Sequence, residues 1–333
     1  MLNRAKLGAL ARAAGAPRGP DAEPIEFGTG AAMLAGRAAW VLVTEADVAD
    51  IASGRGLGAA IIWAHRAGAT ELTVFTEGGV GVMARRAGEF DLPIRVVAAP
   101  GADVSDVVPA EPSPVLAPDP AHLDLVETIA AAGAEPIVEH GVVIGEVCGL
   151  EVCRVVAGTD GAARLEVGIG AHDREAFAMI HGDVPPADAL AGVVDTVAAV
   201  RGPGRPPHPL QRLAPERLMR WRLGHDPSGV GMVAVWPTDP PVPRRNLSDR
   251  SPCTAVGERA DGSTAVIVCS VGVDLDVIPY AADARLARGE PSVGSGGTDS
   301  AELIVVTPSR DAVAATRELA DRLRHSLTLS TFD

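Results

Sequence analysis

The N-terminal part of the sequence alternates short apolar runs with helix-like segments, and this order limits the possible folds more than any other feature. Strand-like runs cover 39–43, 71–75 and 94–98, and helix-like runs cover 57–67 and 80–90. Short apolar strands joined through helices indicate a parallel sheet with right-handed crossovers. The order therefore predicts an α/β protein that begins with a small Rossmann-like βαβαβ layer.

Two proline-rich segments divide the rest of the chain, one at 109–120 and one at 202–209. Such segments favour an extended linker over a packed element. A prior of about one domain per 150 residues also predicts more than one unit. We expect a Rossmann-like domain over 25–108 and an αβββα unit over 121–200. An arginine-rich helix and a βαβα unit over 210–333 could complete the second domain, so that these later α/β units share a mixed sheet.

Two segments are expected to lack packed structure, the leader at 1–24 and the Gly/Ser-rich stretch at 289–300. The leader carries Lys6, which is the only lysine of the chain. A lysine in a mobile leader is not positioned for catalysis. This excludes mechanisms that need a phosphate-binding, Schiff-base or kinase lysine.

The composition indicates a soluble, cytoplasmic protein without a membrane partner. No apolar run approaches the roughly 18 residues that a membrane span needs, and basic residues interrupt the leader before a signal-peptide core can form. The cysteines are too few and too scattered for a disulfide framework, which suits a reducing compartment. They are Cys148, Cys153, Cys253 and Cys269.

Two glycine-rich turns are candidates for binding a nucleotide or another small anion. Each follows a predicted strand and precedes a predicted helix, where glycine allows close backbone approach and the helix N-terminus favours negative charge. Arg55 could add a bidentate phosphate contact. The candidate residues are Gly54, Arg55, Gly56 and Gly58 in the first turn and Gly78 and Gly79 in the second. The alternative is that these glycines serve only the turns.

Carboxylates recur through the middle unit and predict a site for Mg²⁺ or Mn²⁺, which could activate water for phosphodiester cleavage. Glu127 falls on a predicted helix, and Glu151 and Glu166 fall on successive strands. We assign all three as metal ligands, and Glu151 and Glu166 also as catalytic residues. The alternative is a set of acids on the solvent-facing side of a half-covered sheet.

The segment Gly145-Glu-Val-Cys-Gly-Leu-Glu151 followed by Leu165-Glu-Val-Gly168 resembles the PD-(D/E)XK, or restriction-endonuclease-like, arrangement. In that family an acidic residue on one strand precedes E-x-K on the next. Here Gly168 stands in the place of the lysine, and the aspartate of the preceding strand is not clearly present. The resemblance implies a nuclease fold with a degenerate catalytic motif.

An arginine-rich stretch follows residue 200 and contrasts with the acidic middle of this chain of net charge −14. Arginines around an aromatic residue could contact the phosphates and bases of a nucleic acid. The residues assigned to this contact are Arg212, Arg217, Arg220 and Arg222, with Trp221 among them. The favoured alternative is that these arginines balance the acids of the middle unit.

Two smaller motifs have chemistry of their own. Asp274 and Asp276 form a D-x-D pair after a predicted strand, where they could hold a metal or a ribose hydroxyl. His172 and Asp173 begin a predicted helix, and capping explains them without a ligand.

The sequence thus leaves two functions open. The first is a metal-dependent nuclease-like protein, or a degenerate nuclease fold that binds nucleic acid. The second is a sensor or scaffold that binds a nucleotide or a small anion without catalysis.

Overall fold

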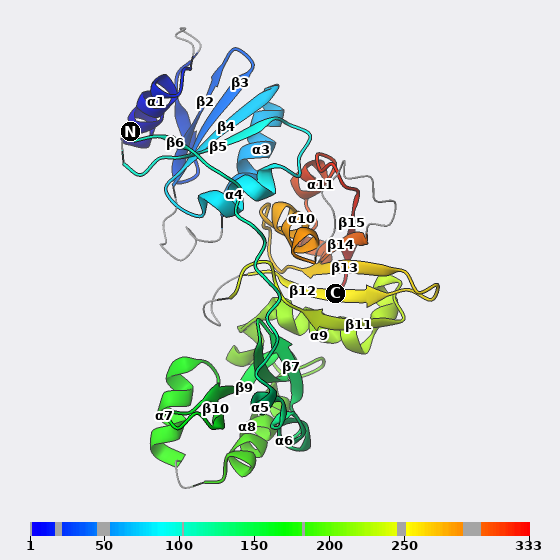
Figure 1. The fold of residues 1–333 in the computed structure, drawn as a ribbon. Helices are drawn as coiled ribbons and strands as arrows, with labels where there is room; N and C mark the ends of the chain where they lie inside the picture. Colours follow the sequence, from blue (N-terminus) through cyan, green and yellow to red (C-terminus); the bar gives the residue numbers. More distant parts are fainter. Residues whose placement is uncertain are drawn as a thin grey trace. The chain divides into compact units, whose positions relative to one another are not determined.

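The chain divides into two compact units in the computed structural model (Figure 1). The structure describes residues 2–16, 22–44, 54–101, 103–181, 184–244, 251–288 and 301–333. The first unit consists of residues 1–112 and 272–331, and the second of residues 113–271 and 332–333. The stretch 289–300, for which we expected no packed structure, lies outside the described residues.

A six-stranded mixed sheet with the order β1-β2-β3-β4-β5-β6 organises the first unit. Its strands are β1 (Ile25–Phe27), β2 (Gly30–Ala35), β3 (Ala38–Val43), β4 (Glu71–Thr76), β5 (Ile94–Ala98) and β6 (Ser105–Asp106). Strands β3, β4 and β5 run parallel, and the outer strands are antiparallel to their neighbours. The α/β class and the alternation of strands and helices are as predicted.

Helices cover both faces of this sheet (Figure 1). They are α1 (Leu2–Ala13) on one face and the crossover helices α3 (Leu57–Arg66) and α4 (Val80–Ala87) on the other. Leu42, Phe75 and Val97 lie side by side on the central strands and share a buried cluster with Leu7 and Leu10 of α1. The expectation of an unpacked leader is therefore wrong for residues 2–13, because the i, i+3 spacing of these leucines makes an apolar helix face.

The C-terminal segment of the chain completes the first unit. It contributes α10 (Val277–Ala287), β14 (Glu302–Thr307), the 3-10 turn Ser309–Asp311, α11 (Ala314–Ala320) and β15 (Leu327–Thr331). Strand β14 pairs in parallel with β15. Asp283 of α10 is fully buried, 2.6 Å from Arg85 Nε and 3.0 Å from Arg86 Nε of α4. These ion pairs join segments that are about 200 positions apart in the sequence.

The expected unit over 210–333 is therefore divided between the two observed units. Residues 210–271 belong to the second unit and 272–331 to the first. Local periodicity does not reveal long-range contacts such as the ion pairs of Asp283 with Arg85 and Arg86.

The second unit contains a four-stranded antiparallel meander in the order β10-β9-β8-β7. Its strands are β7 (Glu135–Glu139), β8 (Val142–Val147), β9 (Leu150–Ala157) and β10 (Ala163–Val167). The helices beside it are α5 (Pro120–Leu123), α6 (Val126–Ala131), α7 (Ala171–His181) and α8 (Pro186–Val200). Ile129, Val152 and Leu190 are fully buried in the core that α6 and α8 form with the sheet.

In the remainder of the second unit, one helix packs against three antiparallel strands. Its elements are the 3-10 turns Pro209–Arg212 and Pro227–Val230, α9 (Pro215–His225), β11 (Ala234–Thr238), β12 (Cys253–Glu258) and β13 (Thr264–Cys269). Strand β12 pairs with β11 and β13, and α9 contacts all three strands. Among the described residues, no helix has the length and apolar character that crossing a membrane requires.

Candidate functional site

The first glycine turn binds a carboxylate of the chain itself. The backbone N–H groups of Gly56 and Gly58 donate to Asp276 Oδ2 and Oδ1 at 2.7 and 2.9 Å. Gly56 has φ 91° at the N-cap of α3, a backbone conformation that glycine adopts without strain. Burial, together with the neighbouring charge of Asp274, raises the pKa of the Asp276 carboxyl. The predicted anion-binding geometry is present, and the anion in it is Asp276.

Arg55 completes this arrangement. Its Nη2 lies 2.8 Å from Asp274 Oδ2, so the D-x-D pair and the glycine turn form one cluster in the first unit. Gly54 precedes this cluster with φ 63°. The cluster joins the C-terminal segment of the first unit to its N-terminal sheet.

The second glycine turn caps α4. Gly79 is the N-cap residue with φ 60°, and the carbonyl of Gly78 accepts a hydrogen bond from the Thr76 hydroxyl at 3.1 Å. The preceding residue, Glu77, pairs with Lys6 of α1. Lys6 is thus held at the carboxyl end of a parallel strand, so its exclusion from chemistry as part of a mobile leader does not hold.

The predicted metal ligand Glu151 is buried and neutralised by arginine. Its Oε1 accepts hydrogen bonds from Arg154 Nε at 2.8 Å and from Arg174 Nη1 at 3.1 Å. Glu166 is half exposed and lies 3.4 Å from Arg174 Nε. The two glutamates therefore share one guanidinium, which is a different arrangement from a pair of carboxylates open to a cation.

Glu127 lies on α6 and is exposed. In the part of the chain that the structure describes, no group of three or more His, Cys, Asp or Glu side chains could hold a metal ion. The structure thus does not bring Glu127 together with Glu151 and Glu166 in such a group.

Two of the four arginines assigned to nucleic acid are buried in a charge network. Arg217 Nη1 lies 2.6 Å from Glu146 Oε1, and Arg220 Nη2 lies 3.0 Å from Glu146 Oε2. Arg217 and Arg220 also lie near Glu139. Burial opposes ionisation of Glu146, but the two guanidinium charges and their hydrogen bonds prevail and lower its pKa.

This arrangement corrects the assignment of Arg217 and Arg220 as phosphate contacts, since both side chains are buried against carboxylates. It agrees with the alternative of internal charge balance. Arg212 is exposed on the 3-10 turn before α9. Arg222 donates to the carbonyl of Asp333 and lies over the ring of Phe332, 4.9 Å from its centroid.

The motif at the start of α7 stabilises the local backbone. Asp173 Oδ2 accepts a hydrogen bond from the backbone N–H of Ile169 at 2.6 Å, and His172 is fully exposed. This fits the interpretation of these residues as helix-start residues that need no ligand.

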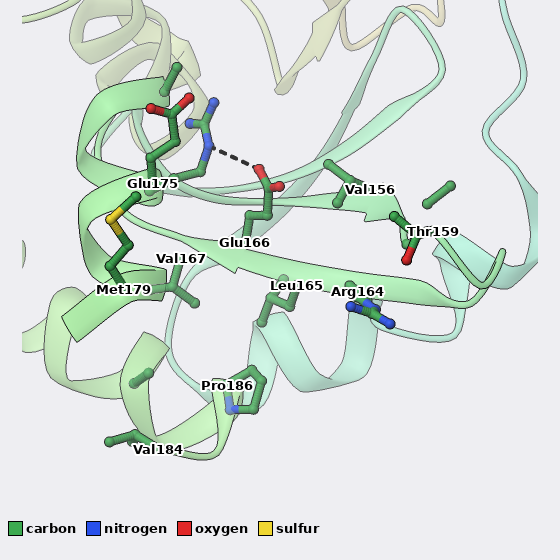
Figure 2. Close-up of a pocket in the computed structure, with 15 residues that line it drawn as sticks. Val156, Thr159, Arg164, Leu165, Glu166, Val167, Glu175, Met179, Val184 and Pro186 are labelled. Carbon is green, nitrogen blue, oxygen red and sulfur yellow. Dashed lines mark ion pairs between the residues drawn. The ribbon is translucent and has the colours of Figure 1, made fainter. Parts of the chain in front are cut away.

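A pocket of about 810 Å³ lies beside the edge strand β10, between α7 and the start of α8 (Figure 2). Leu165 and Val167 point toward Val184 and Pro186, whereas Glu166 points to the other side of the strand (Figure 2). Met179 of α7 is 85% exposed at this pocket. The volume is within the range of about 300–1,000 Å³ that is typical of small-molecule sites.

Arg174 is the buried polar group of the pocket. Its side chain is only 9% exposed, and its Nε has no hydrogen-bond partner among the described residues. Figure 2 shows the ion pair of this guanidinium with Glu166 as a dashed line, and the 3.4 Å separation is longer than a good N–H···O hydrogen bond. A buried donor without an acceptor is costly, so this end of the pocket favours a ligand with an acceptor oxygen.

Sequence reasoning missed this pocket because its lining comes from separate elements. One signal for the pocket was available in the sequence. Helix α7 begins with charged residues and carries the apolar Met179 further along, next to an edge strand. Comparisons of the chain with protein-family models, curated proteins and solved structures found no match.

Proposed function

We propose that the second unit binds a small amphipathic anion, with an apolar body in the pocket beside β10 and a carboxylate at Arg174. The observation that carries this proposal is the nine-tenths-buried guanidinium with an unsatisfied Nε at one end of a mainly apolar pocket. This keeps the hypothesis of a small-anion sensor or scaffold and moves its site from the glycine turn to the second unit.

The apolar lining supports an aliphatic ligand body. Leu165, Val167 and Pro186 line one end, and Ala189 of α8 lies beside them. The described lining residues include no aromatic side chain, so these residues offer no stacking surface for a nucleobase. An alkyl chain gains free energy here because it leaves water, at roughly 25 cal/mol per Å² of buried apolar surface.

The polar end supports a carboxylate head group. Arg174 is anchored on one side by the buried Glu151, while its Nε faces the half-exposed Glu166 at a longer distance. A ligand carboxylate can take the place of Glu166, whose side chain is free to turn toward solvent. The guanidinium fork then donates to the ligand in the geometry that carboxylates favour.

The nuclease-like alternative has less support in this geometry. Its proposed ligand Glu151 is already bound by two arginines, and an arginine does not easily release a proton to act as a base. The PD-(D/E)XK resemblance remains a prediction about the fold of this unit.

Binding by the full chain can be tested by isothermal titration calorimetry with sodium decanoate below its micelle concentration. Decanol is the matched ligand without charge, and ATP tests the nucleotide alternative. We expect one site for decanoate, weaker binding of decanol and no binding of ATP to this pocket. Equal affinities for decanoate and decanol would contradict a role for Arg174.

The matched variants are Arg174→Met and Arg164→Gln. Arg164 also lines the pocket and carries the same charge, but it is 56% exposed and already paired with Asp160 at 2.8 Å. Arg174→Met should weaken decanoate binding about tenfold or more, and Arg164→Gln should change it little. Thermal unfolding of each variant shows whether the unit still folds.

A further inference from the structure

The second unit contains another, smaller pocket of about 140 Å³. It shares no lining residue with the pocket beside β10. It is lined by residues of β7 and β11, the outer strands of their sets, and by α9. Its volume is several times the ~30 Å³ that one water molecule occupies in the liquid. It therefore admits a small organic group.

Aromatic rings form much of the lining. Trp221 and His225 lie one helical turn apart on α9, with ring centroids 4.1 Å apart. Trp236 of β11 lines the same pocket and is 43% exposed. Two of the four tryptophans of the chain therefore line this pocket. An exposed tryptophan beside a hollow is typical of a binding surface.

A carboxylate fixes one of these rings. The indole N–H of Trp221 donates to Glu135 Oε1, and His225 Nε2 lies 3.8 Å from the same oxygen. Glu135 is half exposed, and no lysine or arginine of the described chain pairs with it. It is therefore a half-exposed carboxylate beside an aromatic pocket, with its Oε1 already bound to the indole N–H of Trp221.

Buried arginines and glutamates pair with one another beside the pocket. Arg220 and Glu146 both line it, and they pair with each other at 3.0 Å while Arg217 and Glu139 complete the buried network. Two guanidinium groups thus face two carboxylates. Glu135 lies outside these arginine–glutamate pairs.

We propose that this pocket binds a small quaternary ammonium compound. Tryptophan faces attract cations through the quadrupole of the ring, and aromatic cages with a nearby carboxylate suit methylated ammonium groups. The indole rings of Trp221 and Trp236 contact the methyl groups, and Glu135 supplies the counter-charge. This inference does not depend on the proposed anion pocket, since the two pockets share no lining residue.

The test uses the full chain and choline as the probe. Saturation-transfer NMR detects the bound trimethylammonium signal, and a titration gives the Kd. The control ligand is 3,3-dimethylbutanol, which has the same shape without the charge. We expect choline to bind at least several-fold more tightly than this neutral compound.

Two variants separate the parts of the site. Trp236→Ala should weaken choline binding about tenfold, and Glu135→Gln should weaken it several-fold while preserving the shape of the side chain. Trp63→Phe, in α3 of the first unit, should leave the Kd unchanged. Absence of choline binding, equal binding of the neutral compound, or an unchanged Kd in Trp236→Ala would each overturn the proposal. Glu135→Gln keeps the test valid if Trp236→Ala does not fold.

Discussion

Arg174 Nη1 donates a hydrogen bond of 3.1 Å to Glu151 Oε1, and both side chains are about nine-tenths buried. Glu151, which the sequence suggested as a metal ligand, instead holds the guanidinium of Arg174 in place. Arg174 Nε has no hydrogen bond among the described residues and lies 3.4 Å from Glu166 Oε2. The proposed anion pocket depends on this anchor.

Replacing the anchor should destabilise the second unit. Glu151→Gln leaves Arg154 and Arg174 without their shared negative charge in a buried place, and we expect a loss of about 2–3 kcal/mol in the free energy of unfolding. Urea unfolding followed by the fluorescence of Trp221 and Trp236, in a chain that carries Trp40→Phe and Trp63→Phe, measures it in this unit. The matched change Glu166→Gln, at a half-exposed carboxylate, should cost less than about 1 kcal/mol. Equal losses would argue against Glu151 as the anchor.

Glu146 should make the second unit sensitive to acid. Its pKa is lowered below the ordinary 4.5 in the folded state, so its contribution to stability is present above pH 4.5. That contribution is lost as the pH falls through the lowered pKa, when the buried carboxylate takes up a proton. The difference in unfolding free energy between the wild type and Glu146→Gln should therefore shrink on acidification. A difference that is constant with pH would contradict the ion pairs with Arg217 and Arg220.

Asp276 should show the opposite dependence on pH. Its folded pKa is raised above 3.8 by burial and by Asp274, so the folded state holds the proton more tightly than the unfolded chain. Stability from this group is present below pH 3.8 and is lost as the pH rises through the raised pKa. The free energy of unfolding of the wild type, minus that of Asp276→Asn, should therefore fall as the pH rises from 3.8 through the raised pKa. In a chain that carries Trp221→Phe and Trp236→Phe, the fluorescence of Trp40 and Trp63 reports on the first unit. A free-energy difference that rises with pH would refute the assignment.

Gly58 should not tolerate a side chain. A Cβ at this position would lie 2.4 Å from the backbone oxygen of Leu275, which cannot move without disturbing the Asp276 contact. Gly58→Ala should lower the stability of the first unit by about 1–3 kcal/mol. Gly192→Ala on α8 meets no atom within 4 Å and should instead stabilise its helix by about 0.5–1 kcal/mol. Thermal unfolding of both variants checks the contrast.

Local patterns in the sequence predicted the local structure well. The alternation of apolar runs gave β3, β4 and β5 with their crossover helices, because each run is a complete strand or helix face. The turn between β7 and β8 is formed by His140 and Gly141, both with positive φ. Strand β15 was missed, although Leu327 and Leu329 alternate with polar residues and a turn at 321–326 separates them from the end of α11.

The sequence indicated that arginines balance the acids of the middle unit, but the individual partners could not be predicted from it. Glu146 and Arg217 are 71 positions apart, and Asp283 and Arg85 are 198 apart, so no periodicity connects them. Charged residues are usually exposed, and only the folded chain reveals that these are buried in pairs. For the same reason Glu151 suggested a metal ligand, although its partner Arg174 stands in the same unit.

The most direct test of the proposed function compares the Kd for decanoate, by calorimetry at low ionic strength, in the wild type, Glu166→Gln and Arg174→Met. We expect tighter binding in Glu166→Gln, because a competing carboxylate loses its charge, and much weaker binding in Arg174→Met. Weaker binding in Glu166→Gln, or an unchanged Kd in Arg174→Met, would contradict the assignment of this guanidinium as the anion contact.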